Sequence, residues 1–177
     1  MEKISNQALN RLDEQGFKEA PKFPLVFVLE NVRSALNVGS VFRTADGFRC
    51  EAVFLVGYTA TPANREMYKT ALGATDTVRW EHFERSDQAL IRLREMGYRI
   101  FAAEQVKEPI YLNDFTVQPD DKIAVVFGNE ISGVDQLTIQ QCDGVIEIPQ
   151  FGTKHSFNVA VSAGMMGWHI MNQFLKR

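Results

Sequence analysis

Three short segments of this 177-residue chain are entirely apolar, and they constrain its fold more than any other feature. They are Leu25–Leu29, Ala52–Val56 and Ile123–Phe127. A continuous apolar run of this length, bounded by polar or turn residues, is typical of a strand that is buried on both faces of a sheet. Segments with helical periodicity separate the apolar runs. Strands that alternate with helices predict an α/β fold with a largely parallel sheet.

The rest of the chain fits the same alternation. Further strands are expected at 78–83, 98–103 and 144–148, the first of them an edge strand or a half-exposed strand because its apolar and polar residues alternate. Helices are expected over 5–15 with Ser5 as a possible N-cap, and over 34–48, 87–96, 134–141 and 157–175. Residues 59–75 are expected to be part loop and part short helix. We therefore predict one domain over residues 1–177, with a mostly parallel sheet, helices on both faces, and a helical extension at 1–24.

Composition excludes several other classes. The chain is 45% hydrophobic and 23% charged, which rules out a disordered, collagenous or coiled-coil protein. Cys50 and Cys142 are too few for a disulfide scaffold and are not spaced for zinc, so no metal is expected. The first residues lack the apolar core of a secretory signal, and polar residues interrupt the apolar stretch at 157–175. A cytoplasmic protein without a membrane span is the expectation.

The overall charge gives a weaker indication. A net charge of −3 and a sequence pI near 5.6 argue mildly against a nucleic-acid binder. A local basic face can nevertheless exist on an acidic protein.

Polar residues without an evident packing role follow three of the expected strands, at 31–43, 128–135 and 149–158. In parallel sheets, ligands bind where loops leave the carboxyl ends of the strands. The three segments are therefore the candidate functional segments of the chain.

The first segment places Asn37, Gly39 and Arg43 on the expected helix 34–48. A capping asparagine and a solvated arginine are one interpretation. An arginine near a helix start opposes the local dipole, however, so the position calls for another reason. A bound anion or an RNA phosphate would supply it, because a guanidinium matches the geometry of phosphate.

The second segment contains Gly128 and Gly133 with the spacing of a phosphate loop. Val134 and Asp135 stand where such a loop needs Lys and Ser or Thr, so the P-loop interpretation fails. No GxGxxG follows any strand either. Glu130 is then either an ordinary loop acid or a functional carboxylate at a strand end.

The third segment ends a strand at Pro149 and leads into the last helix. Ser156 and Asn158 stand at the expected helix start, where each alone could be a cap. Lys154 and His155 add cationic capacity to the same loop. Because Ser156 and Asn158 occur together before a nearly apolar helix, we interpret this segment as functional.

That last helix carries small residues on one face, at Ala160, Ala163, Gly164 and Gly167. A helix that is apolar on several sides must be covered on several sides. We infer that the sheet covers one side and another subunit a second. A central buried helix in a monomer is the alternative.

Together, the three segments resemble the three motifs of the SpoU/TrmH class of the SPOUT methyltransferases, in order and at similar spacing. They read NVGSVFRTA at 37–45, VVFGNEISGV at 125–134 and IEIPQFGTKHSFNVAVS at 146–162. Each motif alone is a weak signal, whereas all three in sequence are specific. The match runs from Leu25 into the final helix.

The resemblance implies an α/β domain whose part at 123–177 forms a trefoil knot and binds S-adenosylmethionine, a homodimer, and methyl transfer to a ribose 2′-hydroxyl of tRNA or rRNA. A knot contradicts the usual rule that chains do not thread. Nothing in composition or periodicity predicts it. tRNA is the favoured substrate, because only about 24 residues precede the first strand and RNA would then be bound by the core dimer itself.

The resemblance also assigns roles by position. The implied catalytic residues are Asn37, Arg43, Glu130, Ser156 and Asn158. The implied cofactor contacts, mostly through backbone, are Gly128, Asn129, Ile148, Pro149 and Phe157. The candidate RNA contacts, chosen by charge near these loops, are Arg33, Arg43, Arg65, Lys69 and Lys154.

Two positions depart from the family pattern. Gln150 replaces a common Met, and Phe157 replaces a common Leu; both changes could tune cofactor affinity. The family proposal makes Arg43 the base, but arginine stays protonated in proteins. We expect Arg43 to anchor phosphate and to stabilise developing negative charge, with Glu130 and Asn37 orienting it.

Two other functions stay open at this point. One is a catalytically inactive knotted protein that binds RNA or the cofactor. The other is a small-molecule methyltransferase or a different nucleotide-binding α/β protein, which no sequence feature favours.

Overall fold

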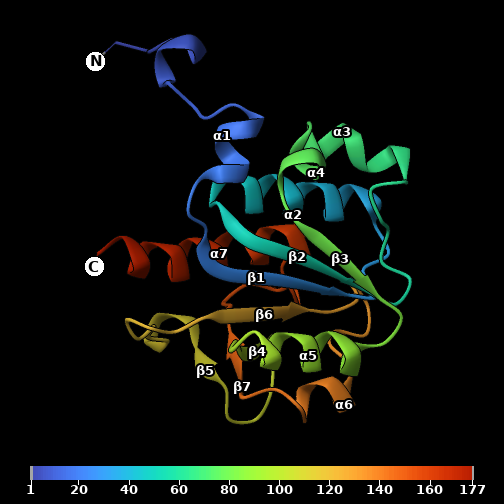
Figure 1. The fold of residues 1–177 in the computed structure, drawn as a ribbon. Coiled ribbons are helices and arrows are strands. Elements are labelled where there is room, and N and C mark those ends of the chain that lie inside the picture. Colours follow the sequence, from blue (N-terminus) through green and yellow to red (C-terminus); the bar gives the residue numbers. More distant parts are fainter. Residues whose placement is uncertain (1, 177) are drawn as a thin grey trace.

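A computed structural model describes residues 2–176 as a seven-stranded sheet in the order β3-β2-β1-β6-β4-β7-β5 (Figure 1). Every pair of neighbouring strands is parallel, as predicted. The strands are β1 (Phe23–Glu30), β2 (Cys50–Val56), β3 (Trp80–Phe83), β4 (Arg99–Ala103), β5 (Ile110–Tyr111), β6 (Ile123–Phe127) and β7 (Gly144–Glu147). The expected edge position of the strand near 78–83 is confirmed for β3.

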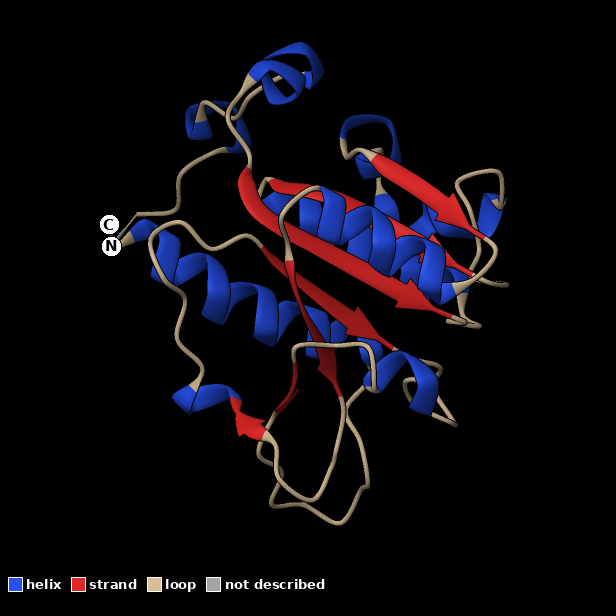
Figure 2. Cartoon of the chain, turned by 60° about the horizontal axis from the view of Figure 1, so that its bottom comes forward, coloured by secondary structure: helices blue, strands red, loops and turns tan. Residues whose placement is uncertain are grey.

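Helices cover both faces of the sheet (Figures 1 and 2). The α-helices are α1 (Glu14–Glu19), α2 (Ala35–Gly47), α3 (Tyr68–Ala71), α4 (Ala74–Thr77), α5 (Ser86–Glu95), α6 (Gln136–Ile139) and α7 (Val159–Leu175). The 3-10 helices are η1 (Asn6–Leu9), η2 (Arg65–Met67) and η3 (Leu112–Asp114). In the described chain, 2–176, no helix combines the length and apolar character needed to cross a membrane.

The central strands are buried on both faces, which confirms the interpretation of the apolar runs. In β1, Leu25, Phe27 and Leu29 pack into the cluster formed with α2 and α7. Val26 and Val28 point to the opposite face and pack with α5. Each of these five side chains is at most 1% exposed. Burial of this kind stabilises the fold by roughly 1.5–3 kcal/mol per large apolar side chain.

The parallel sheet brings several loops to one edge. Because β1, β4, β6 and β7 run in the same direction, the segments that follow their carboxyl ends lie at a common edge. These segments begin at residues 31, 104, 128 and 148. The arrangement places the three candidate segments together, as a parallel sheet should.

The expected helix over residues 5–15 is wrong. Ser5 accepts a hydrogen bond from the backbone N–H of Ala8, as an N-cap does, but the helix is only the 3-10 turn η1. Asn10 ends it in the left-handed conformation at φ 46°. A separate helix α1 then starts at the N-cap Asp13. Leu12 is 53% exposed, so no packing held the two turns together as one helix.

Two further elements differ from the sequence prediction. The helix expected at 134–141 shortens to α6, because Asp135 caps its first turn and Val134 belongs to the preceding loop. The short strand β5 was missed, since two residues carry no periodic signal. Residues 59–75 contain η2, all of α3 and the start of α4 within loop, in agreement with the mixed prediction.

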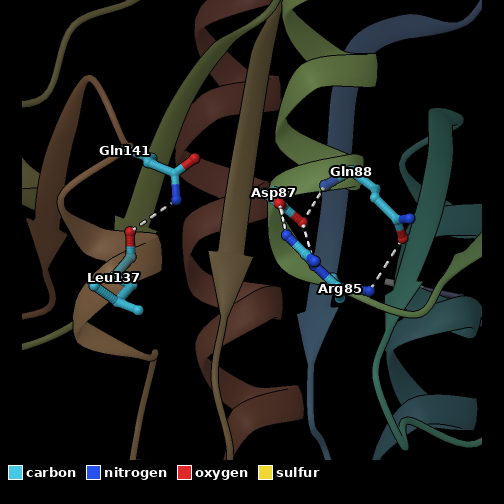
Figure 3. A network of polar contacts seen from close by, with 5 residues as sticks. All are labelled: Arg85, Asp87, Gln88, Leu137 and Gln141. Carbon is cyan, nitrogen blue, oxygen red and sulfur yellow. Dashed lines mark hydrogen bonds and ion pairs between the residues drawn. The ribbon is translucent and has the colours of Figure 1, made fainter.

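Figure 3 shows local polar contacts at the start of α5 and at the end of α6. The backbone N–H of Arg85 donates to Gln88 Oε1 at 3.2 Å, and the guanidinium of Arg85 pairs with Asp87. That guanidinium holds the pKa of Asp87 below its usual value. In α6, Gln141 Nε2 donates to the carbonyl of Leu137 at 3.1 Å. These contacts stabilise the first turn of α5 and the last turn of α6.

Candidate active site

A cavity of about 440 Å³ opens at the carboxyl edge of the sheet. Its volume lies within the range of small-molecule and cofactor sites. The segments that follow β4, β6 and β7 form its walls, and the start of α7 closes it. Glu104 and Glu147 supply acidic groups to the lining, whereas Phe127, Ile146 and Met166 supply apolar surface.

The loop after β6 is a tight, self-closed turn. Asn129 and Gly133 exchange two backbone hydrogen bonds, at 3.0 and 2.9 Å. A Cβ on Gly128 would lie 2.1 Å from the carbonyl carbon of Gly133, and Gly133 itself has φ +71°. The two glycines are therefore required by closure of the loop. Their spacing serves this turn and not a phosphate loop.

Glu130 joins this loop to the first segment. Its carboxylate accepts hydrogen bonds from the backbone N–H groups of Arg33 at 2.9 Å and Ser34 at 3.1 Å. It also accepts one from Asn37 Nδ2 at 3.0 Å. Burial alone would raise the pKa of Glu130, but these donors outweigh it and hold the pKa below its usual value. Glu130 is thus an ionised carboxylate with a hydrogen bond to each of its two oxygens.

Asn37 joins the first segment to the third. Asn158 Nδ2 donates to Asn37 Oδ1 at 3.1 Å. Asn158 Oδ1 meanwhile accepts from the backbone N–H of Ala160 at 2.9 Å and caps α7. The side chain of Asn158 therefore caps α7 with its oxygen and contacts the first segment with its nitrogen. Glu130, Asn37 and Asn158 form a continuous chain of side-chain hydrogen bonds, which we call the polar triad.

Arg43 is placed differently from the other implied catalytic residues. It lies in the second half of α2, so the expectation that it opposes the dipole at the helix start is wrong. Its side chain is exposed and makes no hydrogen bond or ion pair with any residue in 2–176. It lines a second cavity of about 540 Å³ together with Lys69 and Gly164. Within one chain, Asn37 and Glu130 bind each other and neighbouring groups rather than Arg43.

The third segment contributes directly to the first cavity. Ile148, Ser156 and Phe157 line it, and so does Gln150, one of the two departures from the family pattern. Phe157 is 42% exposed, so it borders the opening. Gly128 and Asn129 also line the cavity, whereas Pro149 stands between two lining residues without being one.

The candidate RNA contacts differ in their surroundings. Arg33 and Arg65 are exposed and have no hydrogen-bond or ion-pair partner for their guanidinium groups among the described residues. Lys69 is paired with Glu66 at 2.7 Å. Lys154 is exposed on the third segment and does not line the second cavity, which Arg43 and Lys69 line.

Sequence analysis missed two residues that hold the cavity together. Glu104 accepts hydrogen bonds from the backbone N–H of Val134 at 2.9 Å and from that of Gln105 at 2.8 Å. Gln105 Nε2 donates to the carbonyl of His155 at 2.7 Å. The pair therefore connects the second segment to the third. Both residues directly follow an expected strand, so the rule of polar residues at strand ends would have found them.

A buried carboxylate supports the same loop from the opposite face. Glu30 is 1% exposed and accepts a hydrogen bond from the backbone N–H of Asp135 at 2.8 Å. The hydroxyl groups of Ser86 and Thr138 also donate to it. Its partners satisfy the oxygens of the buried carboxyl group, so Glu30 acts as a structural anchor for the end of the loop.

These features define an α/β protein with a ligand cavity at the carboxyl edge of a parallel sheet, where three polar segments interlock. The chain belongs to the SpoU rRNA Methylase family, whose model matches residues 24–168. The match includes all three segments. The family resemblance seen in the motifs is thereby confirmed.

Comparison with individual proteins agrees with the family. The chain is 34% identical over 143 residues to the 23S rRNA (guanosine-2′-O-)-methyltransferase RlmB of Neisseria meningitidis, covering 81% of this chain and 56% of the relative. The chain thus spans little more than half the length of that relative.

Solved structures show the same fold. The TrmH/SpoU tRNA modifying enzyme of A. aeolicus superposes with a TM-score of 0.79 at 23% identity, over 92% of this chain and 81% of that one. The SpoU methyltransferase AviRb of Streptomyces viridochromogenes, in complex with the cofactor AdoMet, superposes with a TM-score of 0.76 at 18% identity. That match covers 89% of this chain and 60% of AviRb.

Proposed function

We propose that this protein is an S-adenosylmethionine-dependent methyltransferase that acts on a ribose 2′-hydroxyl of RNA. The observation that carries the proposal is the polar triad, which joins the three family segments beside a cofactor-sized cavity. Family membership and the activities in the names of the relatives support the same conclusion.

The cavity fits the proposed cofactor in size and charge. S-adenosylmethionine supplies an activated methyl group on a positively charged sulfonium. The carboxylates of Glu104 and Glu147 in the lining suit a cationic ligand, and the apolar part of the lining suits an adenine ring. Gly128, Asn129, Ile148, Pro149 and Phe157 are the proposed cofactor contacts.

The residues of the chain then have to position the ribose. Ser156 and Asn158 border the cavity and offer hydrogen-bonding groups to a sugar at its opening. Alignment of the attacking oxygen can supply several kcal/mol of the barrier reduction. Glu130 stays ionised at neutral pH and its oxygens are engaged, so it orders the site and is not the general base.

Arg43 has a separate role in this proposal. A guanidinium stays protonated, so Arg43 is suited to bind an RNA phosphate and to stabilise the alkoxide that develops as the hydroxyl loses its proton. Its exposed, unpaired position on α2 leaves it available for RNA. Because it lines the second cavity, a partner subunit is needed to bring an arginine to the first.

A homodimer through α7 would meet that need. Val161, Trp168 and Leu175 are 51%, 54% and 56% exposed and follow one face of this helix. A Cβ at Gly164 would meet nothing within 4 Å, whereas Gly167 and Ala163 face the core. The expected stripe of small residues is thus split between two faces. The trefoil knot within 123–177 stays a prediction alongside the dimer.

rRNA is the first substrate to test. Curated relatives that are 31–34% identical to the chain are named as 23S rRNA methyltransferases. The preference for tRNA rested on the length of the chain and stays a prediction. The alternative is an inactive protein that keeps the cofactor or RNA site without turnover.

The deciding experiment transfers a tritiated methyl group from S-adenosylmethionine to purified rRNA and tRNA in separate reactions. We expect incorporation into at least one RNA, with the label in 2′-O-methylated nucleotides after digestion. Calorimetry with S-adenosylhomocysteine, ATP and NAD accompanies the assay. Binding of S-adenosylhomocysteine without any incorporation would favour the inactive protein, and binding of ATP or NAD alone would refute the proposal.

A further inference from the structure

Tyr58 is an exposed aromatic side chain next to the candidate active site. It follows β2 and is 62% exposed. Its hydroxyl group accepts a hydrogen bond from Asn129 Nδ2 at 2.8 Å. That asparagine belongs to the loop that lines the first cavity. One end of the side chain is therefore fixed to the functional loop while most of the residue remains open to solvent.

The turn that carries Tyr58 is rigid. Gly57 has φ +65°, and a Cβ there would lie 2.0 Å from Asn31 Oδ1, so the turn packs closely on the segment after β1. Thr59 is 3% exposed. Its hydroxyl donates to the carbonyl of Leu29 at 2.8 Å and accepts from the backbone N–H of Val32 at 3.0 Å. A ring held in this way loses little freedom when a ligand packs against it.

A positively charged residue lies on the segment against which the turn packs. The residue after Val32 is Arg33, whose backbone N–H is held by Glu130 while its guanidinium is exposed and unpaired among the described residues. The hydrogen bond from the backbone N–H of Val32 to the Thr59 hydroxyl joins the segment that carries Arg33 to the turn that carries Tyr58. An aromatic face with an adjacent unpaired cation is the combination that binds single-stranded nucleic acid, through stacking and phosphate contact.

We propose that Tyr58 is a stacking platform for an unpaired nucleobase of the RNA substrate, with Arg33 binding the backbone of the same strand. The base is a neighbour of the methylated nucleotide, because the Tyr58 hydroxyl contacts the loop that lines the cofactor cavity. This inference rests on the proposed function and assigns the surface on which the RNA lies.

Three variants test the platform. Tyr58→Ala removes the ring, and Tyr58→Phe keeps the ring but removes the hydroxyl. Tyr68→Ala removes a tyrosine on α3 that is 47% exposed, and serves as the matched control. RNA affinity is measured by fluorescence anisotropy with a labelled single-stranded RNA oligonucleotide, and cofactor affinity by calorimetry with S-adenosylhomocysteine.

We expect Tyr58→Ala to weaken RNA binding by about tenfold or more, as loss of a stacked base does, and to leave cofactor affinity unchanged. Tyr58→Phe and Tyr68→Ala should bind RNA close to the wild-type level. Arg33→Gln should reduce the slope of log RNA affinity against log salt concentration by about one, which corresponds to one lost phosphate contact. Tyr58→Ala should leave that slope unchanged.

Several results would overturn the proposal. If Tyr58→Ala binds RNA with wild-type affinity, Tyr58 is not a stacking platform. Equal losses in Tyr58→Phe and Tyr58→Ala, or a parallel loss of cofactor affinity, would assign Tyr58 to support of Asn129. A wild-type protein that binds RNA and transfers no methyl group would contradict the proposed function. The RNA affinities of the Tyr58 variants would still test the stacking platform, because they are measured without methyl transfer.

Discussion

Asn158 and Asn37 are joined by a side-chain hydrogen bond of 3.1 Å although 121 positions separate them in the chain. Asn37 in turn donates to Glu130 at 3.0 Å. Each residue alone resembles an ordinary cap or loop acid. Their connection shows that the three segments form one unit, so a change in any of them should affect the other two.

The first prediction separates the two roles of Asn158. Asn158→Ser keeps an N-cap for α7 but is too short to reach Asn37, whereas Asn158→Ala loses both contacts. We expect Asn158→Ala to lose about 1 kcal/mol of stability and Asn158→Ser to stay near wild type. Both should lose most methyl transfer. Thermal unfolding and the tritium assay measure the two effects, and an active Asn158→Ser variant would contradict the role of the triad.

The second prediction concerns the pH dependence of Glu130. Its pKa is lower in the folded protein, so its stabilising contribution is complete above the unfolded value of 4.5 and is lost as the pH falls through the folded pKa. The stability difference between wild type and Glu130→Gln should stay constant from neutral pH down to about 4.5 and shrink below it. Denaturant unfolding at a series of pH values measures this difference. A difference that changes around neutral pH would show that Glu130 titrates there.

The third prediction concerns Arg43. Arg43→Ala should abolish methyl transfer and weaken RNA binding while leaving cofactor affinity unchanged, because Arg43 lies outside the first cavity. Arg43→Lys keeps the charge but loses the forked geometry, so partial RNA binding with low turnover is expected. Turnover and affinity are measured on the same RNA. Full turnover in Arg43→Ala would exclude the residue from the reaction.

Much of this arrangement follows from local sequence signals. The apolar runs predict the central strands, and β6 spans residues 123–127 as expected. The polar residues at strand ends predict the site, because parallel strands deliver their loops to one edge. Family resemblance then names Asn37, Glu130 and Asn158, which the structure brings together.

Other features depend on contacts that no local pattern carries. Arg43 lies in the second half of α2, and only tertiary structure assigns it to the second cavity. Residues 5–15 have an apolar stripe but no surface to pack it against, so periodicity overestimates the helix. The proposed role of Tyr58 depends on its hydrogen bond from Asn129, which lies 71 positions away in the chain.

The fourth prediction tests the connection made by Glu104. Glu104→Ala leaves the buried N–H of Val134 without its acceptor, at a cost of about 1–3 kcal/mol, and frees the loop after β6. We expect weaker binding of S-adenosylhomocysteine and a lower melting temperature. Glu108→Ala, an exposed acid a few residues on, is the control for the change in charge. Equal cofactor affinities in the two variants would show that Glu104 does not shape the cavity.

The last prediction asks whether Arg43 acts across a dimer. If it does, a mixed dimer of Arg43→Ala and Asn158→Ala subunits contains one site with both wild-type residues, and mixing two inactive proteins should restore about a quarter of the wild-type activity. If Arg43 acts within its own chain, every site in the mixture lacks one residue and no activity returns. Trp168→Glu places a charge on the exposed face of α7 and should yield a monomer by light scattering, with cofactor affinity retained and methyl transfer lost. A monomeric variant with full activity would refute both the interface and the shared site.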